Sequence, residues 1–447
     1  MKRLSLTFLL SALLVVQCFA QQGRTNSDEV TSMVERFVSY AGYRSHSVAE
    51  PDSGVFLVTR GQRDVAVKVY EDLKAIPDVK VKMSPDYYVY ALIPSNINKD
   101  VPSICFMSHL DITPEVPDAH DGEWVRPQLH VNYDGGDIVL GNGVVISPDK
   151  PEGEGLKNMI GHTIVTSDGT TNLGGDCKGG VAIMVELARH LSSNKQIKHG
   201  DIYLYFTQNE EVGFVADRFE AGYLGVVPDM IFDVDGDMMD AFAVENFSAV
   251  NGILVFKGNL AHPSEGFKSG YADASTAASY WIGQLPPYVH PSYSKGREGY
   301  IHIYNRKEGD GNVKLFFRLR YFNRQDSVLY ADYFEKATAQ TKAAYPRVDI
   351  EMENCSLLYD NVANTIHPKT EELLLKAGKK MGMDMHPEIQ RAGTTCAILT
   401  SKGIAGGANI FAGQHAVHSV YEWVSIEELV WTMHYCEQIA NEVTKLK

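Results

Sequence analysis

The feature that most constrains the fold is a set of short apolar runs, each as long as one buried strand, separated by helical stretches. The runs are residues 87–93, 103–107, 201–206 and 230–232. The helical stretch at 180–191 lies between the middle two, with Val181, Val185 and Ala188 on one face. Strands that alternate with helices predict an α/β fold, in which helices flank a sheet.

One histidine and several acids directly follow three of these runs. They are His109 with Asp111, Glu210 with Glu211, and Asp235, which follow the second, third and fourth runs respectively. In an open α/β sheet, ligands bind in the crevice beyond the carboxyl ends of the strands. The sequence therefore predicts that these side chains meet at one edge of the sheet.

The chemistry of these residue types is that of a metal site. Imidazole nitrogen and carboxylate oxygen both suit Zn²⁺, and Asp111, two residues after His109, is placed to orient the ring. The pattern His-x-Asp is weak by itself, and the adjacent Glu210 and Glu211 also fit a solvated loop. Two acids after a buried strand can instead divide the roles of metal ligand and general base.

Two further segments offer ligands. Asp176 lies in the glycine-rich segment 173–180, which lacks the residue order of a phosphate loop and carries an acid that would oppose a phosphate. Glycines around a carboxylate let the backbone approach closely and direct Asp176 at a cation. His415 and His418 follow a predicted strand at 408–413, and each fits either a ligand or an ordinary surface residue.

Seven motifs in a fixed order carry a family resemblance. They are Ser108-His109-Leu110-Asp111, Thr166-Ser167-Asp168-Gly169 leading to Gly175-Asp176-Cys177-Lys178, segment 206–213 with its Glu pair, Val234-Asp235-Gly236, Glu245-Asn246-Phe247, Ala261-His262-Pro263 and His418-Ser419-Val420-Tyr421-Glu422. Together they resemble peptidase T, the tripeptide aminopeptidase branch of the di-zinc exopeptidases related to aminoacylase and carboxypeptidase G. The resemblance covers nearly the whole chain and implies the fold of those enzymes, with a mixed sheet in the catalytic domain.

The resemblance implies two divalent cations that share Asp176 as a bridging carboxylate. One cation would also take His109 and Asp235, and the other would take Glu211 and His418. Zn²⁺ is expected, and mixed histidine and carboxylate ligands also admit Co²⁺ or Mn²⁺. Such a pair would bring the pKa of a bridging water toward neutrality.

The resemblance also implies four supporting roles. Asp111 would hold the His109 ring, and Glu210 would be the general base that passes a proton from water to the leaving amine. His262 would stabilise the oxyanion, and a plain loop histidine is the alternative. Arg320 would bind the terminal carboxylate of the substrate, because its planar fork pairs both oxygens.

The expected domain organisation follows from the same resemblance. A catalytic domain would comprise residues 21–246 and 359–447, and a smaller α+β lid and dimerisation domain would be inserted at 247–358. Strand-like 253–256, helical 274–285 and strand-like 313–321 fit that insertion. A homodimer is implied only by the resemblance.

Some positions depart from the family pattern. Cys177 stands where an acid usually follows the bridging carboxylate, and Thr395 replaces another expected acid. Tyr321 and Asn323 stand where the family has acids after its arginine. The metal chemistry is thus better supported than the preference for tripeptides.

The first residues of the chain have the layout of a secretory signal peptide. Lys2 and Arg3 precede an apolar run at 4–16, and Ala20 offers a cleavage site. We therefore expect residues 1–20 to be removed and the enzyme to be secreted or periplasmic; a lipid anchor at Cys18 is the less favoured alternative. No later stretch is long and apolar enough to span a membrane. The formal net charge of −15 disfavours a nucleic-acid partner.

The sequence leads to one functional hypothesis with two alternatives. The hypothesis is a metal-dependent aminopeptidase that removes the N-terminal residue of short peptides. The first alternative is hydrolysis of another amide, by a carboxypeptidase or an acylamino-acid deacylase. The second is a non-catalytic peptide-binding relative, which is suggested by Cys177 and Thr395 standing where the family has acids.

Overall fold

The computed structural model describes residues 28–48, 57–116 and 124–446. The predicted signal peptide, residues 1–20, lies outside the described residues. The chain divides into two compact units. The first comprises Met1–Ala243, Ile366–Pro387 and Gly407–Lys447, and the second comprises Val244–Thr365 and Glu388–Gly406.

A large mixed sheet forms the centre of the first unit. Its strands, in spatial order, are β1 (Lys80–Met83), β2 (Val89–Ile93), β8 (Ile202–Thr207), β3 (Ile104–His109), β9 (Met230–Gly236), β16 (Ala408–Phe411), β10 (Ala241–Asn246) and β15 (His386–Gln390). Strands β8, β3, β9 and β16 run parallel to their neighbours in this series. Their carboxyl ends therefore lie at the same edge of the sheet.

The central strands are apolar along their whole length because they are covered on both faces. Every residue of β3 and β8 is buried, which explains why these strands read as continuous apolar runs rather than alternating ones. The register pairs His109 with Thr207, so the residues after both strands leave the sheet at the same level.

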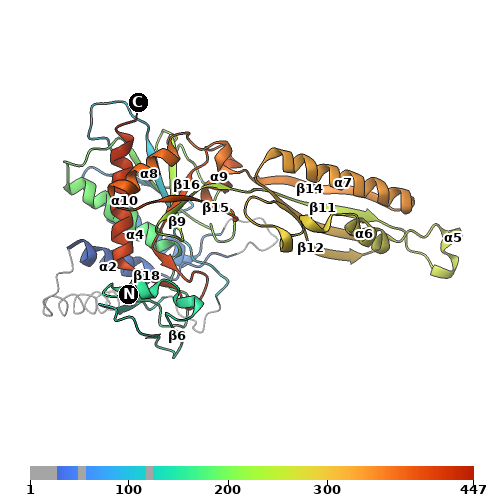
Figure 1. Ribbon diagram of the computed structural model, residues 1–447, viewed down its shortest axis with the longest axis horizontal. Coiled ribbons are helices and arrows are strands. Elements are labelled where there is room, and N and C mark those ends of the chain that lie inside the picture. Colours follow the sequence, from blue (N-terminus) through green and yellow to red (C-terminus); the bar gives the residue numbers. More distant parts are fainter. Residues whose placement is uncertain (1–27, 49–56, 117–123, 447) are drawn as a thin grey trace. The chain divides into compact units, whose positions relative to one another are not determined.

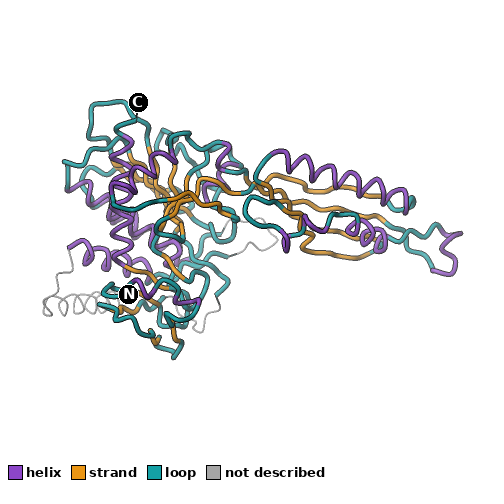
Figure 2. The backbone as a smooth tube through the Cα atoms, viewed as in Figure 1, coloured by secondary structure: helices purple, strands orange, loops and turns teal. Residues whose placement is uncertain are grey.

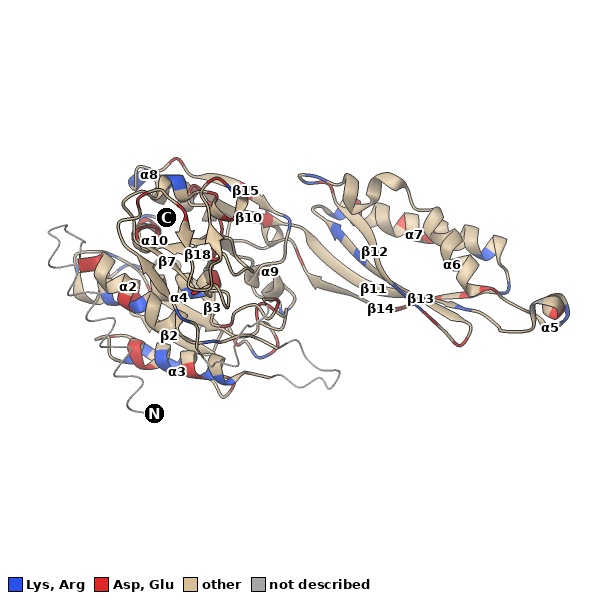
Figure 3. Ribbon diagram, turned by 90° about the horizontal axis from the view of Figure 1, so that it is seen from below, with Lys and Arg blue, Asp and Glu red and all other residues tan. Residues whose placement is uncertain are grey.

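Helices pack on the sheet and on one another (Figure 1). They are α2 (Asp28–Ala41), α3 (Arg60–Lys74), α4 (Gly175–Ser193), α8 (Thr370–Lys380) and α10 (Ile426–Val443). Helix α4 contacts β3 and β9 and is buried over most of its length, and both α2 and α10 contact it. The outer surfaces of α2 and α3 carry both signs of charge, with ion pairs such as Lys68–Asp72 at 2.6 Å (Figure 3). The predicted α/β class, with a mixed sheet flanked by helices, is confirmed.

Short strands complete the first unit. One small sheet has the order β17 (Gln414–His415), β18 (Trp423–Ser425), β7 (Ile164–Thr166) and β4 (Gln128–His130), and β5 (Ile138–Val139) pairs with β6 (Val145–Ile146). Among the described residues, no helix combines the length and apolar character needed to cross a membrane.

The second unit is an antiparallel sheet with helices on it (Figure 2). Its strand order is β12 (Tyr300–Gly309), β13 (Asn312–Tyr321), β11 (Ser248–Lys257) and β14 (Asp349–Tyr359). Helices α6 (Ala274–Gly283) and α7 (Arg324–Ala344) contact this sheet, and α5 (Gly266–Ser269) and α9 (Thr395–Thr400) are short. Trp281 packs edge-on against Phe256 and Phe334 in the core between helices and sheet.

Helix α4 approaches the sheet so closely that only glycine fits at position 180. A Cβ there would lie 2.2 Å from the Val234 carbonyl oxygen and 2.7 Å from Ser108 Oγ. Gly180→Ala should therefore lower the free energy of unfolding by at least about 1–3 kcal/mol, measured by urea denaturation. Gly283→Ala is the control, because its Cβ would meet nothing within 4 Å. Equal stability of the two variants would contradict this close packing.

Candidate metal centre

Three neighbouring strands, one helix and one loop bring the predicted ligands to one place. His109 is the last residue of β3, Asp235 lies near the end of β9, and Glu211 follows β8 by four residues. Asp176 lies at the start of α4, and His418 lies in the loop between β17 and β18. Because these strands are parallel neighbours, residues distant in sequence lie together at the expected edge of the sheet.

Asp176 lies between the two histidines. Its Oδ1 is 2.9 Å from His109 Nε2, and its Oδ2 is 3.3 Å from His418 Nε2. The two oxygens of one carboxylate therefore face two different imidazoles. This is the arrangement that a carboxylate bridging two cations requires.

The other acids complete two groups around Asp176. Asp235 Oδ1 lies 3.8 Å from His109 Nε2, and Glu211 Oε2 lies 3.0 Å from His418 Nε2. Within each group, the atoms available as ligands all lie within 4.8 Å of one another. The structure thus brings all five predicted ligands together, as two groups that share Asp176.

The electrostatics of the site show a shortage of positive charge. Burial raises the pKa of Asp235 well above its usual value, and burial together with nearby carboxylates raises the pKa of Glu210 to about 8. Burial also opposes ionisation of Asp176, but hydrogen bonds from His109 and His418 outweigh it and lower its pKa. Hydrogen bonds from His418 to Asp176 and Glu211 raise the pKa of His418 to about 11.

An unsatisfied oxygen supports the same conclusion. Glu211 Oε1 is buried and has no hydrogen-bond partner among the described residues. Such an oxygen costs free energy unless a donor or a cation meets it. Buried carboxylates, imidazoles and an orphaned oxygen in one cluster fit two divalent cations.

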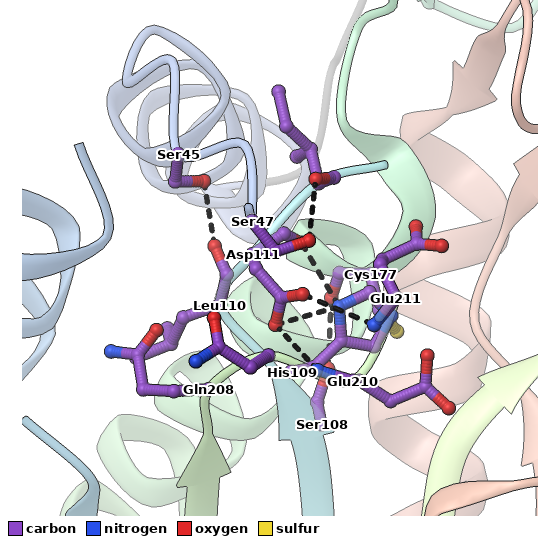
Figure 4. Close-up of polar contacts among 12 residues, drawn as sticks. Ser45, Ser47, Ser108, His109, Leu110, Asp111, Cys177, Gln208, Glu210 and Glu211 are labelled. Atoms are coloured by element: carbon purple, nitrogen blue, oxygen red, sulfur yellow. Dashed lines mark hydrogen bonds and ion pairs between the residues drawn. The ribbon is translucent and has the colours of Figure 1, made fainter. Parts of the chain in front are cut away.

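Asp111 supports the site through its backbone as well as its side chain (Figure 4). Its carbonyl oxygen lies 2.9 Å from His109 Nδ1, whereas its carboxylate Oδ1 lies 3.7 Å away from that nitrogen. The carboxylate accepts the backbone N–H groups of Glu210 and Glu211, each at 3.1 Å. Asp111 therefore fixes the ring tautomer and also positions the Glu pair.

Two supporting residues were not assigned a role from the sequence. Glu422 accepts the backbone N–H groups of Gly174 at 2.7 Å and Asp176 at 2.8 Å, so it holds the turn that presents Asp176. Gln414 donates to Asp235 Oδ1 at 3.1 Å. Glu422 is the last residue of the motif that begins with His418, so the sequence did point to this position. No sequence pattern pointed to Gln414.

Cys177 occupies the position where the family has an acid. Its thiol is buried and donates to the Val234 carbonyl at 2.8 Å. Its own carbonyl accepts Ser108 Oγ–H at 2.8 Å, as Figure 4 shows. These contacts tie the residue after Asp176 to β3 and β9. The Cys177 thiol therefore helps to position the backbone next to Asp176.

The remaining predicted residues belong to the second unit. His262 is exposed, and its Nδ1 lies 2.6 Å from Ser264 Oγ. Arg320 is largely buried on β13, where its guanidinium lies over the rings of Phe247 and Tyr359 and donates to Asn251 Oδ1. The roles predicted for His262 and Arg320 stay predictions.

Solved structures show the same fold. Aminopeptidase PepT from Bacillus cereus matches with a TM-score of 0.69 and 19% identity, covering 93% of this chain and 99% of that one. A dinuclear metal-binding peptidase of family M20 from Bacillus subtilis matches with a TM-score of 0.63 and 15% identity, covering 93% and 99%.

Curated relatives are more similar in sequence. Peptidase T of Shouchella clausii is 33% identical over 92% of this chain and 98% of its own length. Peptidase T of Bacillus cereus strain B4264 is 32% identical over 92% and 98%. The predicted secreted or periplasmic location is wrong, because the peptidases T that match nearly the whole chain are cytoplasmic enzymes.

A family model gives the same assignment as the relatives and as the geometry of the site. The model of peptidase family M20/M25/M40 matches residues 174–442, a segment that contains Asp176, Glu211, Asp235 and His418. The chain therefore belongs to peptidase family M20/M25/M40, as a metal-dependent aminopeptidase of its peptidase T branch.

Proposed function

We propose that the chain removes the N-terminal residue of tripeptides at a pair of zinc ions held by the five residues of the candidate metal centre. The observation that carries the proposal is the position of Asp176, whose two oxygens face His109 and His418. His109 and Asp235 would hold one ion, and Glu211 and His418 the other. Both would share Asp176.

The chemistry divides between the ions and the protein. When bound, two divalent cations lower the pKa of water and polarise the peptide carbonyl. Glu210 takes a proton from the attacking water and delivers it to the leaving amine. Asp111 holds the backbone N–H of Glu210, so the base is fixed relative to His109.

Three further assignments belong to the proposal. Zn²⁺ is the proposed metal because imidazole and carboxylate ligands in a buried cluster suit it. His262 is proposed to stabilise the oxyanion and Arg320 to bind the substrate carboxylate, for which its planar fork is suited. The second unit is proposed as a lid that also forms a homodimer.

A panel of short peptides tests the proposed function. Protein loaded with Zn²⁺ should release only the N-terminal residue from free tripeptides, and should not act on N-acetylated ones, when the products are identified by mass. Treatment with a chelator should abolish release, and added Zn²⁺ should restore it. Release of the C-terminal residue, or cleavage of the blocked peptides, would contradict the aminopeptidase assignment.

A further inference from the structure

A second cluster of histidine and glutamate lies on the helices of the first unit, formed by Glu29, His190, His434 and Glu437. Glu29 is in the first turn of α2, His190 is in the last turn of α4, and His434 and Glu437 are one turn apart on α10. These three helices contact one another (Figure 1). We propose that Glu29, His190 and His434 bind one Zn²⁺, separate from the candidate metal centre.

The geometry around Glu29 is that of metal ligands. His434 Nε2 lies 3.2 Å from Glu29 Oε2, and His190 Nδ1 lies 3.6 Å from Glu29 Oε1. One ligand atom from each of the three residues lies within 4.8 Å of the others. Tetrahedral zinc with bonds of about 2.0–2.2 Å separates its ligand atoms by about 3.3–3.5 Å, which falls within this range.

His434 Nε2 and Glu29 Oε2 are within hydrogen-bond distance, but at 3.2 Å their contact is longer than another histidine–carboxylate hydrogen bond in the same unit. His415 Nε2 lies 2.7 Å from Glu428 Oε2, the length of a charge-assisted bond. In the candidate metal centre, the distances from His418 Nε2 to Glu211 and Asp176 are 3.0 and 3.3 Å. His109 Nε2 in that centre lies 2.9 Å from Asp176 and 3.8 Å from Asp235, and the distances of 3.2–3.6 Å in the helix cluster fall between these two values.

Glu437 lies on the other side of both rings. Its Oε2 is 3.3 Å from His190 Nε2 and 3.3 Å from His434 Nδ1. These are the nitrogens that do not face Glu29. Ligating histidines commonly donate their second N–H to a carboxylate, which fixes the tautomer and directs the free nitrogen at the metal. Glu437 supplies this contact for both rings at once.

The site is partly open to solvent and links three helices. The side chains of Glu29, His190 and His434 are 34%, 19% and 29% exposed, so water completes the coordination of an ion held by three protein ligands. Histidine binds a metal ion in its neutral form, so with a dication bound the two carboxylates of the cluster would balance its charge. A bound ion would fasten α2 to α4 and α10, and so stabilise the folded state in proportion to its occupancy.

Zinc content measured on the full-length protein tests this proposal. After loading with Zn²⁺ and dialysis, His434→Gln should contain one zinc per chain fewer than the original protein, and its peptidase activity should be unchanged. His386→Gln, which alters an exposed histidine on β15, is the control and should lose none. If His434→Gln does not fold, Glu29→Gln provides the same comparison.

A variant in which the candidate metal centre (the main centre) no longer binds zinc distinguishes the two sites. Asp176→Asn should still bind one zinc per chain in a calorimetric titration, and Asp176→Asn combined with His434→Gln should bind none. Equal zinc content in the original protein and in His434→Gln would overturn the proposal, and the cluster would then be a ring of ion pairs only. Absence of zinc binding by Asp176→Asn would overturn it as well.

Discussion

Replacement of Glu210 by Gln is expected to lower kcat for tripeptide hydrolysis by on the order of 10²–10⁴-fold while the metal content stays the same. The amide keeps the size of the side chain but cannot accept the proton of water. Glu210 is not one of the residues in the two ligand groups, so its loss leaves both groups intact. The Asp111 carboxylate still holds the backbone N–H at this position.

The comparison needs activity and metal content from the same preparations. Glu220→Gln, an exposed glutamate of the first unit, is the matched control and should keep full activity. If Glu210→Gln keeps more than a tenth of the original kcat, Glu210 is not the general base. Loss of metal in this variant would instead make it a ligand.

Replacement of Asp176 by Asn is expected to abolish both the hydrolysis of tripeptides and the binding of both cations of the main centre. An asparagine offers one neutral oxygen where two charged oxygens face His109 and His418. Two dications at close range repel each other, and the shared anion offsets that repulsion. Each affinity should fall by more than the roughly 10–100-fold loss that removal of an outer-shell partner causes.

Asp235→Asn is the matched variant, because Asp235 belongs to only one of the two groups. It should weaken one cation of the candidate metal centre much more than the other, which calorimetric titration in the His434→Gln background resolves as two unequal steps. If Asp176→Asn still held both cations, or lost only one, Asp176 would not be the shared ligand.

Much of the main centre was predictable because it depends on where strands end. Central parallel strands are buried on both faces, so β3 and β8 appear as apolar runs, and the polar residue that follows each run marks the edge of the sheet. His109, Glu211 and Asp235 could be found in this way. Asp176 and His418 needed the family resemblance as well.

Contacts that depend on loop conformation could not be predicted. Glu422 reaches the backbone of Gly174 and Asp176 from 246 and more residues away, and no local pattern encodes such a contact. The Asp111 carbonyl, rather than its carboxylate, contacts the His109 ring because the chain turns directly after β3. The apolar run at 4–16 predicted a secreted or periplasmic location, and this prediction was wrong. The location was decided by the relatives that match nearly the whole chain, and not by this local pattern.

The cluster on α2, α4 and α10 shows the same limit. His190 and His434 are unremarkable in sequence, because each lies on a helix whose pattern is set by packing. Only the way the three helices meet brings them to Glu29. Sites made across helix interfaces therefore need the structure.

Anomalous X-ray diffraction at the zinc absorption edge, on crystals of zinc-loaded protein, tests the central claim most directly. At the candidate metal centre the account predicts two peaks about 3.5–4 Å apart, the spacing of two-metal sites, one beside each oxygen of Asp176. One of them should adjoin His109 and the other His418. A single peak at Asp176, or two peaks that do not share its carboxylate, would contradict the account.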